Sequence, residues 1–449
     1  MHQYADMIQH DLIRALVRGW LDFRQQLLKG VLWNLVSTLS LQGSMLITGA
    51  LVARIIGIED FGIYALMMST LMTLTGVAQG SSGIVATKFV AEGLADQPQR
   101  VARVMRMCAV ATAASGIFCA SLLWASASII ADELLHKPAV EPHLRMVAFA
   151  VVFQVLIAYQ HGALQGFGAY KRLGLASSMA GLLHLVASVL GAAISGLEGA
   201  VQGLVVAAIG RSLIAYFALR KTLAEHGIQR ASKVNRDELR MVWTFALPST
   251  LAGYVTLPCI WAVTLLVARQ PDGLAWTALF SVAHQIKQAV LQLPAMLNVV
   301  AFSALSRAKG RDDLKSSRKI FLSSLIASFV FVVFVTLITS ALAPEILSLF
   351  GGNFVEGVGL LRILLLAAVL EATASVVYQL VQSRGLMWHS FFIIVLPRDV
   401  GYLALAAIGL ATWGLMGAGL AYLLAHVGGL MLTIFLVHLT RTRFGPLSC

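Results

Sequence analysis

Long apolar stretches separated by short polar connections recur along the whole chain. Each stretch has about 20 residues or more, enough for a helix to cross roughly 30 Å of hydrocarbon. A membrane β-barrel would instead show alternating segments of about ten residues, and the sequence lacks that alternation. The pattern predicts an all-α polytopic membrane protein with about twelve transmembrane helices, at residues 31–53, 61–86, 104–130, 144–165, 173–194, 199–219, 243–267, 274–300, 320–343, 359–382, 387–410 and 412–438.

The segments outside these stretches suggest how the chain is divided. Residues 1–29 are amphipathic and lack the apolar core and cleavage site of a secretory signal. We expect them to form a cytoplasmic segment, either a helix at the membrane interface or a flexible tail. The remainder divides into an N-terminal six-helix bundle (30–219), a basic cytoplasmic linker (220–240), a C-terminal six-helix bundle (241–440) and a cytoplasmic tail (441–449).

The two predicted bundles repeat each other in sequence. The word LVAR occurs at 51–54 and again at 266–269, and Tyr159-Gln160 is echoed by Tyr378-Gln379. An even number of helices per repeat means that both bundles enter the membrane from the same side, so the repeats are parallel. Two such bundles facing one another predict a central cleft that can open to either side.

Composition supports the membrane assignment. Of 449 residues, 58% are hydrophobic and only 12% are charged, more apolar surface than a soluble protein can bury. The net charge of +12 is unevenly placed: 25 of the 33 Lys and Arg residues lie in one set of connections and 5 in the other. By the positive-inside rule, both termini and the linker of this multi-pass protein are cytoplasmic, and the basic balance does not indicate nucleic-acid binding.

The predicted eighth span contains a polar stripe. Ser281, His284, Lys287, Gln288 and Gln292 share one helical face, and Lys287 lies too deep to reach the interface easily. Such a stripe is typical of a helix that lines a hydrated cavity, and it predicts that Lys287 faces the cleft. The alternative is a structural lysine paired with a neighbouring acid.

Other charges lie in the C-terminal spans. Pro397 can bend the eleventh span beside Arg398 and Asp399, which diverge by about 100° on a helix and should not pair unless the bend helps. Glu371, in the tenth span, is a candidate partner of Lys287 or Arg398, or a proton-binding group itself.

Several further polar residues have less specific interpretations. Arg54 and Arg269 end the first and seventh spans and would face each other across the outer mouth, or anchor to headgroups. Arg211 is expected to reach the cytoplasmic interface. His161, His184 and His426 are isolated within spans and are expected to be packed hydrogen-bonding groups.

No catalytic constellation is present in the sequence. It has no phosphate-binding glycine loop with a lysine, no nucleophile with a base, and no paired histidine ligands. Its four cysteines have neither metal-ligand spacing nor a disulfide pattern. We therefore expect no enzyme activity, metal or other cofactor.

Three segments resemble one family of membrane proteins. They are LLKGVLWNLVSTLSLQGSMLITGALVARIIGIEDFGIYAL at 27–66, with its Asp60-Phe61-Gly62-Ile63-Tyr64 element, ALQGFGAYKR at 163–172 and ALPSTLAG at 246–253. Their order and spacing resemble the bacterial O-antigen and polysaccharide flippases, the Wzx-type members of the MATE-like multidrug/oligosaccharidyl-lipid/polysaccharide exporter superfamily.

This resemblance implies a function and a set of roles. Such a flippase moves an undecaprenyl-diphosphate-linked oligosaccharide across the inner membrane by alternating access, coupled to an ion gradient. On this reading Lys287 and Arg398 hold the diphosphate or acidic sugars, and Arg54 and Arg269 assist at the outer mouth. His284, Gln288 and Gln292 contact sugar, and Glu371 and Asp399 couple the ion. The partners implied are the polyprenyl-diphosphate-linked glycan, the lipid bilayer, and the polysaccharide polymerase and chain-length machinery.

Rival functions remain open at this point. A drug or cation exporter of the same superfamily should line its cleft with acids, whereas this chain balances Lys287 and Arg398 against Glu371 and Asp399. A peptidoglycan-precursor flippase usually has fourteen membrane spans, whereas twelve are predicted here. A membrane glycosyltransferase would need a long outer loop, and the predicted connections are short.

Overall fold

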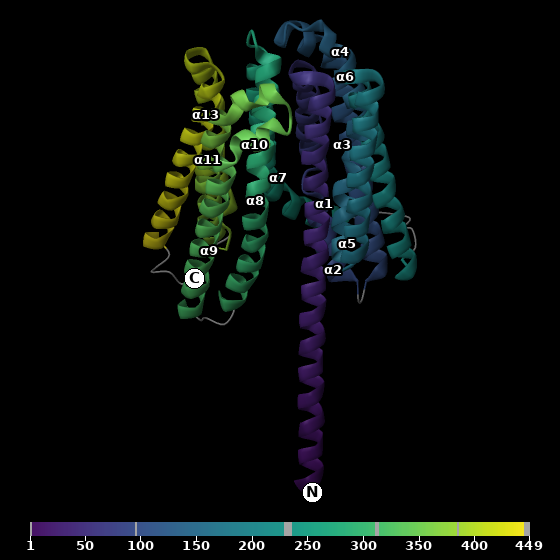
Figure 1. Cartoon of the computed structure of the whole chain (residues 1–449). Helices are drawn as coiled ribbons and strands as arrows, with labels where there is room; N and C mark the ends of the chain where they lie inside the picture. The colour runs from purple at the N-terminus through teal and green to yellow at the C-terminus, as the bar shows by residue number, and fades with distance from the viewer. Residues whose placement is uncertain (1, 95–96, 229–235, 310–313, 384–385, 444–449) are drawn as a thin grey trace.

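The protein is an assembly of helices with no strand among the residues described by the computed structural model, which are 2–94, 97–228, 236–309, 314–383 and 386–443. The predicted linker 220–240 and tail 441–449 lie partly outside these ranges. Figure 1 shows the helices gathered into two groups, the N-terminal half (α1–α6) and the C-terminal half (α7–α13). The helices are α1 (His2–Gln79), α2 (Ser82–Gly93), α3 (Pro98–Ser128), α4 (Glu141–Gln154), α5 (Leu156–Gly166), α6 (Tyr170–Glu225), α7 (Arg236–Ala268), α8 (Gly273–Lys309), α9 (Leu314–Ala341), α10 (Ala343–Ser348), α11 (Val358–Ser383), α12 (Met387–Ser390) and α13 (Leu396–Arg443).

Three of the long helices are hairpins of two arms. The helical backbone is interrupted at Gly57 in α1, at Gly196 in α6 and at Gly414 in α13. Gly196 (φ 59°) and Gly414 (φ 57°) have nearly the same positive-φ conformation, which a side chain would disfavour. They are also 218 residues apart, close to the offsets of the sequence repeat.

Glycines let the arms of these hairpins touch backbone to backbone. A Cβ on Gly191 would lie 2.0 Å from the carbonyl oxygen of Gly199, and a Cβ on Gly417 would lie 1.9 Å from that of Gly409. The two pairs are again 218 residues apart. The hairpins at the end of each half are therefore built alike, which supports the internal repeat, while the exact domain boundaries stay a prediction.

The apolar segments agree with the predicted all-α membrane fold. Within the described residues, seven segments are long and apolar enough to cross a membrane. Three of them, Leu32–Gln79, Tyr170–Glu225 and Trp388–Leu439, contain the hairpin reversals and so hold two predicted spans each. A shorter apolar stretch, Gly253–Ala268, lies in α7. The count of twelve crossings stays a prediction.

The N-terminal segment and the first predicted span form one continuous helix. From His2 onward, the N-terminal segment is helical and continues in line into the first arm of α1, well beyond the ends of the neighbouring helices (Figure 1). The sequence analysis expected an interfacial helix or a flexible tail in 1–29. The structure shows this segment as a helix, and its position at the membrane interface stays a prediction.

A wide helical turn precedes the predicted proline bend. Phe391–Val395 forms a π-helical turn directly before Pro397. A proline has no N–H for the carbonyl four residues earlier, here that of Ile393, and a local widening relieves the resulting clash. The predicted distortion of the eleventh span is thus present, one turn upstream of Arg398 and Asp399.

The two halves share their largest core at the hairpin end. The largest buried cluster includes Leu66 of α1 and Val282 of α8, together with residues beside Gly196 and Gly414. There α1 and α8 come so close that a Cβ on Gly62 would lie 2.0 Å from the carbonyl oxygen of Leu274. Away from the hairpins, the remaining buried clusters each belong to one half alone. The halves therefore share buried core at the hairpin end, and α1 also packs on α7 further along, where a Cβ on Gly80 would lie 3.1 Å from a side-chain carbon of Thr250.

We predict that Gly191→Ala destabilises the protein by about 1–3 kcal/mol, since the added methyl meets the backbone of Gly199 and forces the arms of α6 apart. Thermal unfolding of the purified protein in detergent measures the effect. Gly401→Ala in α13 is the control, because no atom lies within 4 Å of its Cβ position, and it should be neutral or slightly stabilising. Equal melting temperatures for both variants would contradict the backbone contact.

Candidate functional site

A cavity of about 410 Å³ lies between the two halves. Its N-terminal wall comes from both arms of α1 and from His184 of α6, and its other wall comes from α7 and α8. Among the described residues that line it, none is Asp, Glu, Lys or Arg. The lining offers amide, hydroxyl, imidazole, thioether and aromatic groups beside aliphatic surface. The lining residues are Gln42, Met45, Gly49, Phe61, Tyr64, Ala65, Met68, Ser69, Met72, Thr73, His184, Leu257, Ile260, Thr264, Phe280, Ser281, Val282, His284, Gln285 and Gln288.

The predicted polar face of α8 is present, but it is rotated relative to the prediction. His284 and Gln288 line the cavity, and Gln285, which the sequence analysis did not single out, lines it too. Gln292 is half-buried and is not among the lining residues. Lys287 lies on the flank of this face, and its side chain is fully buried.

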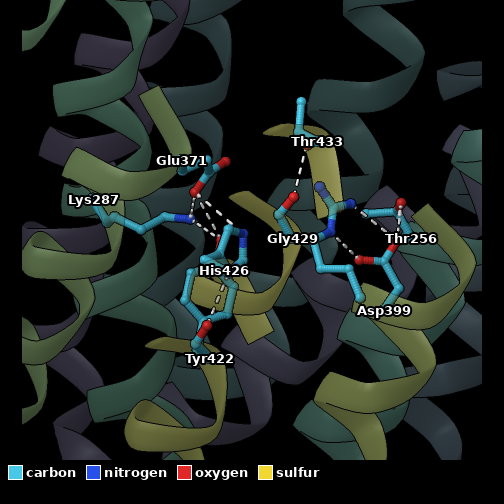
Figure 2. A network of polar contacts seen from close by, with 9 residues as sticks. Thr256, Lys287, Glu371, Asp399, Tyr422, His426, Gly429 and Thr433 are labelled. Atoms are coloured by element: carbon cyan, nitrogen blue, oxygen red, sulfur yellow. Dashed lines mark hydrogen bonds and ion pairs between the residues drawn. The ribbon is translucent and has the colours of Figure 1, made fainter. Parts of the chain in front are cut away.

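Lys287 points into the C-terminal half, toward α11 and α13 (Figure 2). Its ammonium lies 2.9 Å from a carboxylate oxygen of Glu371 and also donates to the hydroxyl of Tyr422. The Tyr422 hydroxyl donates to the same Glu371 oxygen over 2.9 Å. His426, one turn beyond Tyr422, has its Nε2 3.8 Å from that oxygen and its Nδ1 on the Tyr422 carbonyl.

This arrangement differs from the predicted orientation of Lys287 toward the cleft. The ammonium is held by an acid and a phenol, as in the alternative of a lysine paired with a neighbouring acid. The Glu371 side chain is 30% exposed, whereas that of Lys287 is fully buried. Solvent or a solute can therefore reach the carboxylate of this ion pair but not the ammonium. Glu371 is thus the partner of Lys287, one of the two candidates that the sequence left open.

Arg398 and Asp399 form an ion pair, which the sequence analysis expected only if a bend assisted. The Arg398 Nε lies 2.7 Å from Asp399 Oδ1, and its Nη2 lies 3.1 Å from Oδ2. Thr256 of α7 donates its hydroxyl to the same carboxylate. Asp399 is buried and Arg398 is 25% exposed. This two-pronged contact forms immediately after the π-helical turn and Pro397, and Arg398 packs against Gly429 in the second arm of α13. Figure 2 shows Asp399 beside Thr256.

Arg54 and Arg269 lie at the joined end of the two halves, and each contacts the other half. Arg54 donates to the carbonyl oxygen of Ser348 over 3.2 Å, and the Nη2 of Arg269 lies 3.4 Å from the Nε2 of His136. Lys137 adds a third bond, donating to the carbonyl of Ala268 over 3.0 Å, and partial burial lowers its pKa. The predicted mouth is therefore closed in this structure by contacts between the halves.

Sequence reasoning missed several residues of these sites. Tyr422 and His426 are four residues apart and so share a helical face, a signal that was available but was not used. Gln42 and Tyr64 reach the cavity from the two arms of α1. The sequence analysis named Tyr64 only as part of the element that resembles a family, and it did not name Gln42. Only the packing of α1 against α8 brings them opposite His284.

Comparison with known proteins places the chain in a family. The family described as "Polysaccharide biosynthesis protein" matches residues 27–309. The chain is 25% identical over 402 residues to the EPS I polysaccharide export inner membrane protein EpsE of Ralstonia nicotianae, covering 86% of this chain and 87% of that protein.

Solved structures share the fold. An inward-facing multidrug resistance MATE family transporter of the MOP superfamily superposes with a TM-score of 0.74 at 17% identity, covering 92% of this chain and 99% of that one. An outward-facing MATE transporter gives 0.65 at 16% identity, covering 91% and 96%. The resemblance seen in the sequence is confirmed: this chain belongs to the polysaccharide biosynthesis protein family and has the fold of MOP-superfamily transporters.

Proposed function

We propose that the protein translocates a polyprenyl-diphosphate-linked oligosaccharide across the bacterial inner membrane, by alternating access around the central cavity. The observation that carries the proposal is the lining of that cavity, which offers hydrogen-bonding groups and aromatic surface without a charged residue among those described. Sugars present hydroxyls and apolar ring faces, and uncharged amides and aromatic rings complement both. The polysaccharide family and the export protein of Ralstonia point the same way.

The bilayer constrains how such a substrate can be moved. A glycan and its diphosphate cannot cross hydrocarbon unaided, whereas the polyprenyl tail can stay in lipid throughout. With both termini in the cytoplasm, as the distribution of basic residues predicts, the joined hairpin end faces outward. The head group then enters from the cytoplasmic side, and release follows when the contacts of Arg54, Lys137 and Arg269 open.

A drug or cation exporter of the same superfamily is the second candidate, favoured only by the fold. A cationic cargo calls for carboxylates facing it. No described residue lining the cavity is acidic, and both Glu371 and Asp399 already hold a cation of this chain. The glycan is therefore the better-supported cargo.

Glu371 and Asp399 are our candidates for ion coupling, and the two ion pairs suggest how coupling would work. The ammonium of Lys287 occupies the position at Glu371 that an external cation would take. A proton or metal cation bound at Glu371 would displace Lys287 and leave its charge available. We propose that Lys287 and Arg398 reach the anionic head group only in that state, since in the present conformation both are neutralised.

The sugar contacts predict a transport defect. Gln285→Leu with Gln288→Leu should slow the transfer of a fluorescent polyprenyl-diphosphate sugar between leaflets of proteoliposomes by about tenfold. Two lost hydrogen bonds of about 0.5–1.5 kcal/mol each account for that size. Gln202→Leu, the same change at an exposed position of α6, is the control and should transport normally. Wild-type rates in the double variant, or no transfer above empty liposomes by the wild type, would refute the proposal.

The buried ion pair predicts an asymmetric effect on stability. Lys287→Met leaves Glu371 without its cation and should cost toward the lower end of roughly 3–5 kcal/mol, because Glu371 is partly exposed. Lys287→Met combined with Glu371→Met removes both charges and should be less destabilising than the single change. Chemical unfolding in detergent measures both, and a double variant less stable than the single one contradicts the ion pair.

Ion coupling predicts a separate change in kinetics. Transfer by the wild type should accelerate when a proton or sodium gradient is imposed, and Glu371→Gln should abolish that acceleration because the amide cannot exchange a cation. Glu198→Gln, at an exposed acid beside the α6 reversal, should respond like the wild type. A gradient response retained by Glu371→Gln would remove Glu371 from the coupling role.

A further inference from the structure

A second cavity, of about 720 Å³, lies inside the N-terminal half, between α3, α5 and α6. We call it the lateral cavity, and it shares no lining residue with the central one. One wall is a single face of α3, at residues 102, 105, 106 and 109, and the other is a single face of α6, from Tyr216 to Ala224. α5 packs against both helices and contributes Tyr159, which is buried, as the floor.

The lateral cavity opens on the lipid side of the protein. α3, α5 and α6 lie on the far side of α1 from the C-terminal half (Figure 1). At the back of the cavity, Met105 and Leu219 belong to the buried cluster of the N-terminal half, whereas Tyr216 at its rim is exposed. Beside the lining, Val110 and Phe217 are large apolar side chains that are 61% and 59% exposed. In a membrane protein such a surface faces acyl chains.

Two arginines lie in the lining at the level where the apolar spans end. Arg106 is two residues inside the predicted span that begins at 104, and Arg220 is one residue beyond the predicted span that ends at 219. Both are exposed, and both are in the half of their helix that is remote from the reversal at Gly196. The distribution of basic residues predicts that this end is cytoplasmic. The two guanidinium groups therefore belong at the level of the head groups of the cytoplasmic leaflet.

The lining combines this positive charge with an apolar slot. Among its described residues none is Asp or Glu, and Glu225, the acid at the end of α6, is paired with Arg172. About one helical turn deeper in the membrane than the arginines, the lining consists of Ala109 on α3 and Tyr216 on α6, with Tyr159 between them on α5. A ligand that fits this surface has an anionic group and an apolar chain attached to it.

We propose that the lateral cavity binds a phospholipid with an anionic head group from the cytoplasmic leaflet. Its phosphate lies on Arg106 and Arg220, and one acyl chain lies along Ala109 and Tyr159. A guanidinium binds phosphate oxygens through paired N–H donors, and basic pockets between transmembrane helices on the cytoplasmic side suit anionic head groups. A zwitterionic lipid adds an ammonium, which this lining offers no acid to receive.

The bound phospholipid is distinct from the transported cargo. It contacts α3, α5 and the second arm of α6, and it reaches none of the residues that line the central cavity. The inference goes beyond the proposed function and holds whatever the central cavity carries. Such a lipid joins α3 to α6 at the end of the N-terminal half that is remote from the hairpin reversals.

The charge of the site is tested by lipid binding to the purified full chain in a neutral detergent. The probes are tail-labelled phosphatidylglycerol and phosphatidylcholine with the same acyl chains, and the wild type should prefer the first. Arg106→Gln with Arg220→Gln should weaken phosphatidylglycerol binding by about tenfold or more, the loss expected for hydrogen bonds to a charged group. It should leave phosphatidylcholine binding unchanged.

A matched control removes the same charge outside the cavity. Lys171 and Lys221 are exposed residues near the two ends of α6, which lie at the same end of the bundle, and neither lines the lateral cavity. Lys171→Gln with Lys221→Gln should keep the phosphatidylglycerol affinity within about twofold of the wild type, because exposed charges outside the site are screened by salt.

The shape of the site is tested with both arginines in place. Ala109→Phe fills the apolar slot and should weaken phosphatidylglycerol binding, whereas Val110→Phe makes a similar change at the next residue, outside the lining, and should bind like the wild type. If the arginine variant is not monodisperse, this pair decides the question, and wild-type affinity in Ala109→Phe overturns the proposal.

The other outcomes are equally decisive. Equal affinity of the wild type for the two phospholipids, unchanged phosphatidylglycerol binding by the arginine variant, or an equal loss in the lysine control overturns the proposal. Competition by free glycerol phosphate as strong as that by phosphatidylglycerol shows a site for soluble anions and overturns the lipid assignment. Displacement of phosphatidylglycerol by polyprenyl diphosphate at equal concentration assigns the cavity to substrate entry and overturns the assignment to a phospholipid.

Discussion

Charge inside a membrane needs a partner, and this constraint accounts for most of the polar architecture of the protein. In the C-terminal half it produces two separate ion pairs, Lys287 with Glu371 and Arg398 with Asp399, each completed by a hydroxyl from another helix. These pairs hold α8, α11 and α13 together and fix α7 against the bend in α13. The cations best placed by sequence for an anionic cargo are therefore occupied in this conformation.

The constraint also shapes the cavity between the two halves. In the C-terminal half, the cations of Lys287 and Arg398 are paired with acids outside the cavity lining. The wall nearest the cavity on the C-terminal side, His284, Gln285 and Gln288, is uncharged.

Sequence periodicity predicted much of this and failed for definable reasons. Helical spacing correctly grouped His284 with Gln288, but a stripe of five polar residues covers more of the helix circumference than the cavity does. Lys287 therefore lies at the edge of this stripe. Its ammonium donates a hydrogen bond to the hydroxyl of Tyr422, which is 135 residues away in the sequence. Arg398 and Asp399 diverge at the backbone, yet the arginine is long enough to turn back once the π-helical turn and proline have loosened the helix.

The contacts that close the hairpin end all run from a cation to a neutral acceptor. Arg54 and Lys137 bond to main-chain oxygens, and Arg269 approaches an imidazole. Separation of the two halves at this end therefore leaves no carboxylate without its cation. Solvent can replace such bonds one for one, at little enthalpic penalty in either direction. No salt bridge has to break or form when this end opens and closes. Closing should therefore depend mainly on the packing of the apolar surfaces around Gly62 and Leu274.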